Sequence, residues 1–119
     1  MSTISSYKDL VVWQKSMELV ADVYRLTLKL PHDERFGLVS QMRGAVVSVP
    51  SNIVEGYGRQ ATGEYRHHLS ISRGSLFELE TQLFVCVKVG YLENHHVQKV
   101  LEEIQVISKM LGSLINKLR

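Results

Sequence analysis

The sequence predicts an all-α protein, an antiparallel four-helix bundle whose successive helices run up, down, up and down. The 119 residues include only two prolines and eight glycines, and most of the glycines stand where a periodic segment ends. Glycine and proline in these positions are typical of helices joined by short connections. Four segments repeat apolar residues every three or four positions, as amphipathic helices do. Connections of roughly four to six residues force neighbouring helices to pack antiparallel.

The first predicted helix extends from about Lys8 to Leu30 and ends before Pro31. Its apolar residues alternate spacings of three and four, so one face of the helix is expected to be buried. The residues of this predicted face are Leu10, Trp13, Met17, Val20, Tyr24 and Thr27.

The second predicted helix extends to about Tyr57, and Asp33 is its candidate N-terminal cap. Pro50 lies inside the helix, where it lacks an amide donor and presses its ring on the carbonyl four residues earlier, so we expect a kink. Gly56 and Gly58 offer the positive φ angle that closes many helices. The predicted buried residues are Val39, Met42, Val46, Val49 and Ile53.

The third predicted helix begins at a Thr62 cap and extends to about Val89, and the fourth begins near an Asn94 cap. Both place apolar residues on a seven-residue repeat. The expected core residues of the third helix are Leu69, Ser72, Leu76, Leu79, Leu83 and Cys86. Those of the fourth are Val97, Val100, Ile104, Ile107, Leu111, Leu114 and Leu118.

A second apolar stripe on the third helix widens its apolar arc. Phe77, Phe84 and Tyr91 follow Leu76 and Leu83 by about one residue, roughly 100° around the helix axis. The stripe either contacts a second helix of the same bundle or forms a subunit interface, since large exposed apolar patches mark association sites. Trp13 has the same two interpretations, so the candidate oligomer-interface residues are Trp13, Phe77 and Phe84.

Composition sets further limits. With 45% hydrophobic and 22% charged residues, residues 1–119 are expected to form a single globular domain. Cys86 is the only cysteine, which excludes an internal disulfide and favours a small core residue over a nucleophile. No apolar run approaches the length of a membrane span and the first residues do not form a signal sequence, so we expect a cytoplasmic protein without membrane contact.

A line of polar residues accompanies the apolar face of the second helix. Its members are Gln41, Ser48, Asn52, Glu55 and Arg59, and the third helix offers Ser75, Glu78 and Gln82 on a similar line. If the two lines face each other, these groups must find hydrogen-bond partners, because a buried unpaired polar group costs about 1–3 kcal/mol. The alternatives are an inter-helix network, for which Gln41, Ser48, Asn52, Glu55 and Glu78 are the candidates, and a solvated face.

The sequence predicts neither a cofactor nor catalysis. Glu55, Glu78 and Glu80 lack the Glu-x-x-His motifs of di-iron bundles. The pairs His67–His68 and His95–His96 are adjacent residues, which point about 100° apart on a helix and are not expected to chelate one ion. No serine has a histidine and an acid in a recognisable catalytic pattern. We therefore expect no metal site and no enzyme.

Basic residues cluster in the middle of the chain. Five arginines and no lysines lie between Arg35 and Arg73, against two glutamates, although the whole chain has a net charge of only +2. The planar fork of arginine suits phosphate. The candidate nucleic-acid contacts are Arg43, Arg59, Arg66 and Arg73, and a symmetric assembly would join their charges into a continuous basic surface.

Three blocks resemble the four-helix-bundle proteins of the 23S rRNA intervening-sequence family. They are Tyr-Lys-Asp-Leu-Val-Val-Trp-Gln-Lys (7–15), Ser-Val-Pro-Ser-Asn-Ile-Val-Glu-Gly (48–56) and Gly-Ser-Leu-Phe-Glu-Leu-Glu (74–80). The resemblance implies a cytosolic bacterial bundle, commonly a ring of five subunits without known catalysis. Similar proteins accompany the reverse transcriptases of diversity-generating retroelements, where a basic pentamer contacts nucleic acid and the polymerase.

The resemblance extends to individual positions. The residues that match the family pattern are Gln41, Arg43, Ser48, Asn52, Glu55, Arg59 and Glu78, whereas Gly44 replaces a second basic residue that the family often has after Arg43. Two hypotheses stay open. The protein is a non-enzymatic homo-oligomeric scaffold that binds RNA or DNA, or it is a protein-interaction adaptor, for example for a polymerase, without nucleic-acid contact.

Overall fold

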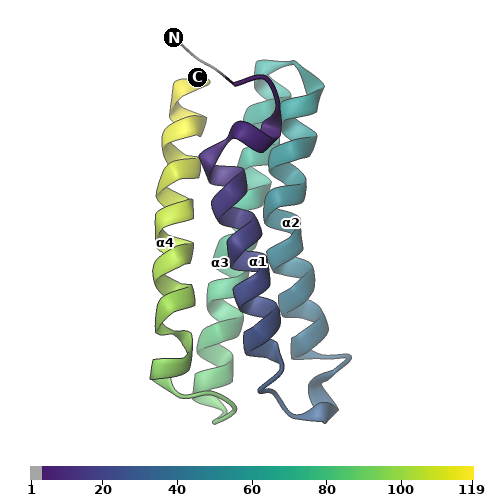
Figure 1. Ribbon diagram of the computed structural model, residues 1–119, viewed down its shortest axis with the longest axis vertical. Coiled ribbons are helices and arrows are strands. Elements are labelled where there is room, and N and C mark those ends of the chain that lie inside the picture. The colour runs from purple at the N-terminus through teal and green to yellow at the C-terminus, as the bar shows by residue number, and fades with distance from the viewer. Residues whose placement is uncertain (1–3) are drawn as a thin grey trace.

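Four long helices and two short 3₁₀ helices make up the described chain, residues 4–119 of this computed structural model (Figure 1). The elements in chain order are η1 (Tyr7–Asp9), α1 (Val11–Thr27), η2 (His32–Glu34), α2 (Leu38–Arg59), α3 (Thr62–Lys88) and α4 (Asn94–Lys117). The predicted all-α four-helix fold is confirmed.

Each helix packs against the next one along the chain, and α4 closes the bundle against α1. The α1–α2 pair therefore lies on the opposite side of the bundle from the α3–α4 pair. The bundle measures 47 × 24 × 22 Å, in keeping with a 27-residue α3 that rises about 1.5 Å per residue. None of the helices in residues 4–119 combines the length and the apolarity that a bilayer span requires.

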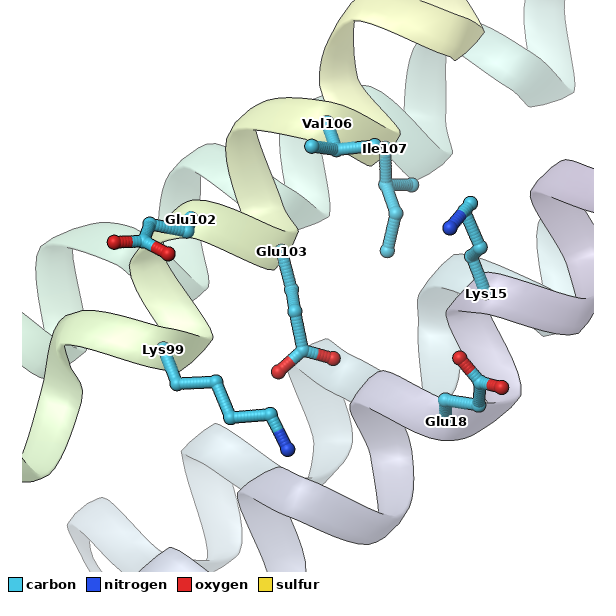
Figure 2. A pocket seen from close by; sticks show the side chains of 7 residues that line it. All are labelled: Lys15, Glu18, Lys99, Glu102, Glu103, Val106 and Ile107. Carbon is cyan, nitrogen blue, oxygen red and sulfur yellow. The ribbon is translucent and has the colours of Figure 1, made fainter.

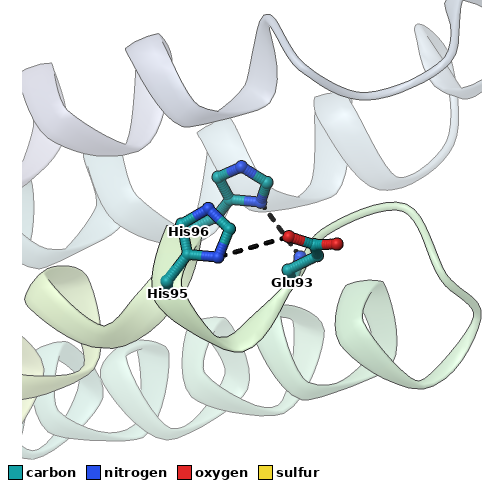
Figure 3. Close-up of side chains that lie close together, drawn as sticks. All are labelled: Glu93, His95 and His96. Atoms are coloured by element: carbon teal, nitrogen blue, oxygen red, sulfur yellow. Dashed lines mark hydrogen bonds and ion pairs between the residues drawn. The ribbon is translucent and has the colours of Figure 1, made fainter.

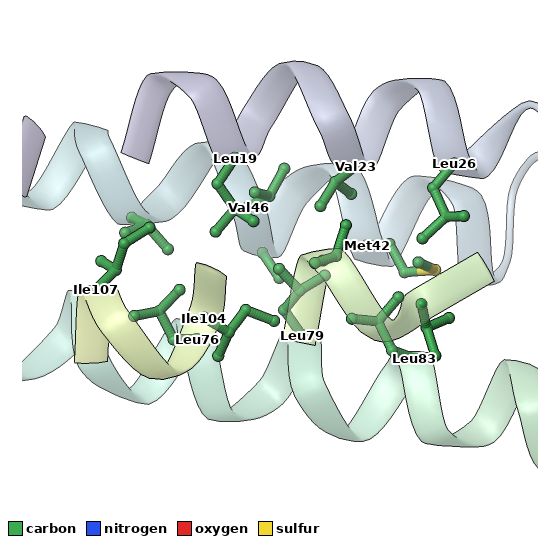
Figure 4. Close-up of a cluster of buried hydrophobic side chains, with 14 of the residues drawn as sticks. Leu19, Val23, Leu26, Met42, Val46, Leu76, Leu79, Leu83, Ile104 and Ile107 are labelled. Carbon is green, nitrogen blue, oxygen red and sulfur yellow. The ribbon is translucent and has the colours of Figure 1, made fainter. Parts of the chain in front are cut away.

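Leucine, isoleucine, valine and methionine from all four helices fill the space between them (Figure 4). The largest fully buried side chains are Leu19, Met42, Ile53, Leu69, Leu76, Leu79, Leu83, Ile104, Ile107 and Leu111. All six core residues predicted for α3 are buried. One of them, Cys86, lies with its Sγ 3.8 Å from Met42 Sδ, and burial raises the pKa of its thiol.

The buried face of α1 differs from the predicted one. The helix buries Val12, Ser16, Leu19, Val23, Leu26 and Thr27, and of these only Thr27 belongs to the predicted stripe. Met17 and Tyr24 are exposed, and Trp13 is half-buried. Because α1 has apolar residues on two adjacent faces, spacing alone does not decide which face enters the core. Leu10, Trp13 and Val20 of the predicted stripe are only partly buried and pack at the edge of the core.

Two core predictions need smaller corrections. On α2, Val39 is only partly buried, whereas Met42, Val46, Val49 and Ile53 are buried. In the last turn of α4, Ile115 enters the core in place of Leu114 and Leu118, which pack at its edge. A straight helix drifts by about 20° per heptad relative to a strict seven-residue repeat, so the buried position shifts along a long helix.

The predicted caps at the starts of three helices are wrong. Asp33 lies in η2, and the Leu38 amide instead donates to Glu34 Oε1 at 3.1 Å. The N-cap of α3 is Ala61, so Thr62 is already helical. The N-cap of α4 is Glu93, which makes Asn94 the first helical residue. The N-cap of α2 is Gly37, so the three errors are shifts of one to four residues along the chain.

The junction between α2 and α3 also differs from the prediction. Gly56 and Gly58 are helical, and the residue that closes α2 is Gln60, with φ of 58° in the left-handed region. Only Gln60 and Ala61 separate the two helices. Pro50 is buried within an uninterrupted α2, and the kink expected there stays a prediction.

Candidate functional site

A hydrogen-bonded network joins the middle of α2 to α3. Ser48 Oγ lies 2.9 Å from Ser75 Oγ, and Asn52 Nδ2 donates to Ser48 Oγ at 3.0 Å and to the Ser48 carbonyl at 2.9 Å. On the other side of the amide, Asn52 Oδ1 lies 3.0 Å from His68 Nδ1. These four residues form what we call the α2–α3 network, and all of them are partly buried.

The helices approach each other closely beside this network. The buried Ser72 hydroxyl donates to the Val49 carbonyl at 2.7 Å. About two turns further along α2, a Cβ atom at Gly56 would lie 2.8 Å from His68 Cβ and 3.1 Å from the Tyr65 carbonyl oxygen. Since real Cβ atoms do not approach other atoms so closely, only glycine allows this separation of α2 and α3.

Three other residues of the predicted network lie outside it. Gln41, Glu55 and Glu78 are exposed. Glu55 Oε1 accepts a hydrogen bond from Arg59 at 2.8 Å, and this bond, with the charge of the guanidinium, lowers the pKa of Glu55. The structure therefore brings together Ser48 and Asn52 of the five candidates.

Sequence reasoning missed His68 as a partner and treated Ser72 only as a core position. The signal was present, because His68, Ser72 and Ser75 follow spacings of four and three, which place them on one line of α3. Residues on such a line face the matching line of Ser48 and Asn52 on the neighbouring helix.

Arg59, at the end of α2, is paired with carboxylates. Its guanidinium lies 2.8 Å from Glu55 and 3.7 Å from Glu64, and these acids raise its pKa. Two acidic partners neutralise the charge of this arginine.

Arg43, on α2, contacts the C-terminal end of α1. Its Nε donates to Thr27 Oγ1 at 3.0 Å, and its guanidinium stacks over the Tyr24 ring at 4.4 Å from the centroid. The half-buried side chain thus joins α2 to the end of α1.

Arg66 and Arg73 lie along the outer junction of α3 and α4. Arg66 donates to the Leu118 carbonyl at 3.0 Å, and Arg73 Nε donates to Ser108 Oγ at 3.3 Å. The Arg73 guanidinium also covers Gly112, where a Cβ atom would lie 3.4 Å from it. Both partners are neutral oxygens, and within residues 4–119 neither arginine forms an ion pair with a carboxylate.

A polar pocket of about 310 Å³ opens beside Arg66. Its lining residues are Gly63, Arg66, His67, Ser70, Ile115 and Arg119. Two arginines and a histidine around one recess form a basic surface, which together with Arg73 we call the α3–α4 arginine face.

The opposite side of the bundle presents an apolar groove of about 450 Å³ between α1 and α2. Its lining residues are Tyr7, Trp13, Met17, Val20, Val47, Pro50, Ser51 and Val54. The ring of Tyr7 contacts the ring of Trp13 edge-on, with centroids 5.2 Å apart. This α1–α2 groove includes Trp13, Met17 and Val20, three residues of the α1 stripe predicted to be buried in the core.

The other two interface candidates lie elsewhere. Phe77 and Phe84 are 50% and 53% exposed on α3, which lies diagonally across the bundle from α1. The Arg73 guanidinium lies 5.7 Å from the centre of the Phe77 ring, so this aromatic stripe borders the α3–α4 arginine face. The structure therefore does not bring Trp13 together with Phe77 and Phe84.

Charged side chains surround a cavity of about 190 Å³ between α1 and α4 (Figure 2). Burial, together with the neighbouring Asp22 carboxyl, raises the pKa of Glu103 to about 7. The pKa of Asp22 is lowered, because hydrogen bonds with Glu103 and Arg25 and the charge of Lys99 outweigh its desolvation. Lys99 Nζ lies 3.5 Å from Asp22, and Glu103 Oε1 is buried without a hydrogen-bond partner.

Glu55, Glu78 and Glu80, the carboxylates considered from the sequence, do not form a cluster of metal-ligating groups within residues 4–119. A different set of three such residues comes together at Glu93, His95 and His96.

The sequence matches the model of the family described as 23S rRNA-intervening sequence protein over residues 8–113. The chain belongs to this family. The match includes α1, α2, α3, most of α4 and the α2–α3 network. The Ser-Val-Pro-Ser-Asn block that suggested the family therefore also supplies helix-packing contacts.

A solved structure described as a protein of unknown function from the S23 ribosomal protein family of Bacteroides thetaiotaomicron has the same fold. Its TM-score is 0.79 at 22% sequence identity, and the alignment covers 88% of this chain and 98% of that one. No curated protein matches the sequence. The family assignment and the bundle are thus shown, while neither comparison describes an activity.

Proposed function

We propose that this 23S rRNA-intervening sequence family member is a non-enzymatic, homo-oligomeric cytoplasmic scaffold that binds nucleic-acid phosphates through its α3–α4 arginine face. The supporting observation is the contrast among the four candidate arginines. Arg59 has two carboxylate partners, whereas Arg66 and Arg73 bond only to neutral oxygens. Their positive charge is therefore available to an external anion.

The fixed orientation of both side chains also supports phosphate binding. A guanidinium has five N–H donors, so Arg66 and Arg73 keep free donors after the bonds to Leu118 and Ser108. Those bonds fix the orientation of the two guanidinium groups. An arginine side chain that is already ordered loses less conformational entropy when it binds a phosphate. Arg43 contacts the end of α1 on the opposite side of the bundle, so it does not belong to the α3–α4 arginine face.

The α1–α2 groove is the surface we assign to self-association. It exposes Trp13, Met17 and Val47 on the side of the bundle away from the arginine face. Covering this groove with like subunits, in the pentamer that the resemblance implies, would leave the arginine faces available. A basic patch repeated around a ring strengthens the attraction for a polyanion.

The test is the affinity of the chain for a fluorescent single-stranded RNA or DNA oligonucleotide at several salt concentrations. The wild-type chain is expected to bind at low salt and to weaken as salt rises, because phosphate binding releases counterions. Arg66→Gln and Arg73→Gln should each lower the affinity and reduce the salt slope by about one.

Arg59→Gln is the matched control, since it removes the same charge from an arginine already paired with acids. It is expected to change the affinity and the slope far less than the other two variants. The proposal fails if the wild-type chain does not bind at low salt, or if Arg59→Gln weakens binding as much as Arg66→Gln.

Phe77 and Phe84 favour a second candidate, a protein-interaction adaptor. Two half-exposed aromatic side chains seven residues apart on one helix suit the groove or helix of a partner protein. Phe77→Ala and Phe84→Ala would then abolish capture of that partner from the native host, and nucleic-acid binding would be absent. Co-purification of both classes of molecule, identified together, decides between the candidates.

A further inference from the structure

The first turn of α4 places three metal-ligating side chains together on the surface (Figure 3). Glu93, His95 and His96 each offer one ligand atom, and these atoms lie within 4.8 Å of one another. Glu93 and His95 are exposed and His96 is half-buried, so a cation reaches the cluster from solvent.

The two adjacent histidines converge, contrary to the expectation from a regular helix. Their ring centroids are 4.1 Å apart and the rings are tilted by 43°. Both rings turn towards Glu93, since His95 Nδ1 lies 3.3 Å from its carboxylate and His96 Nδ1 accepts a hydrogen bond from its backbone amide. Adjacent positions on a helix diverge by about 100°, and rotation about the side-chain bonds overcomes this divergence.

The distances suit a tetrahedral ion. Glu93 Oε2 lies 3.3 Å from His95 Nδ1. Ligands that are 2.0–2.1 Å from a tetrahedral Zn²⁺ are separated by about 3.4 Å, so this pair already spans one edge of the coordination sphere. The third ligand atom, from the half-buried His96, lies within 4.8 Å of the other two, and metal binding requires it to move closer.

His96 is already held in a suitable orientation. The Glu93 backbone amide donates to His96 Nδ1 at 3.0 Å, so this ring nitrogen offers a lone pair and lies beside the Glu93 backbone. A cation would replace this amide at Nδ1. Each imidazole then keeps its proton on Nε2, so both rings ligate in their neutral form.

We propose that Glu93, His95 and His96 form a surface site for a divalent transition-metal cation of the Zn²⁺ type. Two imidazole nitrogens and one carboxylate oxygen supply three ligands, and water occupies the fourth position. This donor set suits zinc, nickel and copper, whereas calcium and magnesium prefer sites made of oxygen alone.

The experiment titrates the untagged full chain with ZnCl₂ in a calorimeter, and with CoCl₂ while visible absorption is recorded. The expected result is saturable binding of one ion per chain, with the strong absorption of tetrahedrally coordinated Co²⁺. His95→Ala and Glu93→Gln should each weaken binding by about tenfold or more, since each removes a ligand or its charge.

His67→Ala provides the matched control. It removes an exposed histidine from the other adjacent pair, whose rings are 5.6 Å apart, and should leave zinc affinity unchanged. His96→Gln tests the third ligand, and circular dichroism of every variant checks that the helices are intact. The proposal is overturned if the wild-type chain shows no saturable uptake, or if His95→Ala binds Zn²⁺ as tightly as wild type.

Discussion

The interface between α2 and α3 and the interface between α1 and α4 accommodate polar groups in opposite ways. The first uses uncharged side chains, Ser48, Asn52 and Ser75, which bond to one another and to His68. The second contains carboxylates and amines around a cavity, with Glu103 Oε1 unpartnered. One bundle thus has a closely packed neutral contact and a loosely packed charged one.

The difference shows how packing distance and charge are related. A neutral network loses little hydration energy on burial when every group is bonded, so α2 and α3 can approach as closely as Gly56 permits. Charged groups lose much more, and their mutual attraction seldom compensates fully for desolvation. The α1–α4 interface accordingly stays partly open to water, and its stability depends on pH.

Gly56→Ala is expected to have the largest effect, because it introduces a Cβ atom where α2 and α3 have no space for one. We expect the free energy of unfolding to fall by about 2–3 kcal/mol, as for other overpacked sites. Chemical denaturation measures the change. Gly58→Ala is the control, since its Cβ atom would meet nothing within 4 Å. If both variants are equally stable, α2 and α3 are not closely packed at Gly56.

Asn52→Ala breaks the centre of the neutral network. It leaves His68 Nδ1 and the Ser48 hydroxyl each without one partner, at an expected cost of about 1–2 kcal/mol. Gln41→Ala on the same helix alters an exposed side chain and should change stability by less than about 0.5 kcal/mol. Equal effects of the two substitutions would mean that the network adds no stability.

Glu103→Gln tests the charged interface. The folded pKa of Glu103, about 7, lies above the ordinary value of 4.5. Between these values the folded state keeps a proton that the unfolded state has lost, so the free energy of unfolding falls as pH rises from about 4.5 to about 7. With allowance for partial exposure, we expect Glu103→Gln to stabilise the protein by about 1 kcal/mol at pH 8.

The same substitution should leave stability at about pH 3 nearly unchanged, because Glu103 is then protonated in both the folded and the unfolded state. Thermal unfolding of wild type and variant between about pH 3 and about pH 8 measures this difference. Glu102→Gln removes a charge from an exposed neighbour and serves as the control. Parallel pH profiles for wild type and Glu103→Gln would contradict a raised pKa.

The smallest expected effects are the pairwise coupling energies. A double-mutant cycle with Ser48→Ala and Ser75→Ala should give about 0.5–1 kcal/mol for the 2.9 Å bond between the two hydroxyls. A cycle with Asp22→Asn and Lys99→Met should give less, about 0–0.5 kcal/mol, because the Lys99 side chain is 78% exposed. The reverse order would show that the charged interface is the more strongly coupled one.

The sequence predicted the elements that depend on one strong periodic signal. The core of α3 followed from its leucine repeat, and the core of α4 matched its predicted stripe up to the last turn. The buried face of α1 did not follow, because Trp13, Met17 and Val20 compete with Val12, Leu19 and Val23 for the same role. Burial is decided by the surface that the neighbouring helices offer, which one helix does not specify.

The candidate site was predictable in part for a similar reason. Ser48 and Asn52 were found because they share a line on α2, but their partner His68 was not, since pairing depends on the relative height of two helices. The sequence also did not indicate which arginines pair with carboxylates. Arg59 pairs with Glu55, one turn earlier on α2, and with Glu64 at the start of α3. Arg66 instead bonds to the carbonyl of Leu118, 52 residues away in the sequence.

The two-residue link at Gln60 and Ala61 has a consequence for folding kinetics. Helices joined so tightly meet without closing a long loop, and contacts between nearby segments form fast. We expect α2 and α3 to pair first and to serve as the nucleus on which α1 and α4 then dock. Amide hydrogen exchange in pulses during refolding should accordingly show protection first along these two helices.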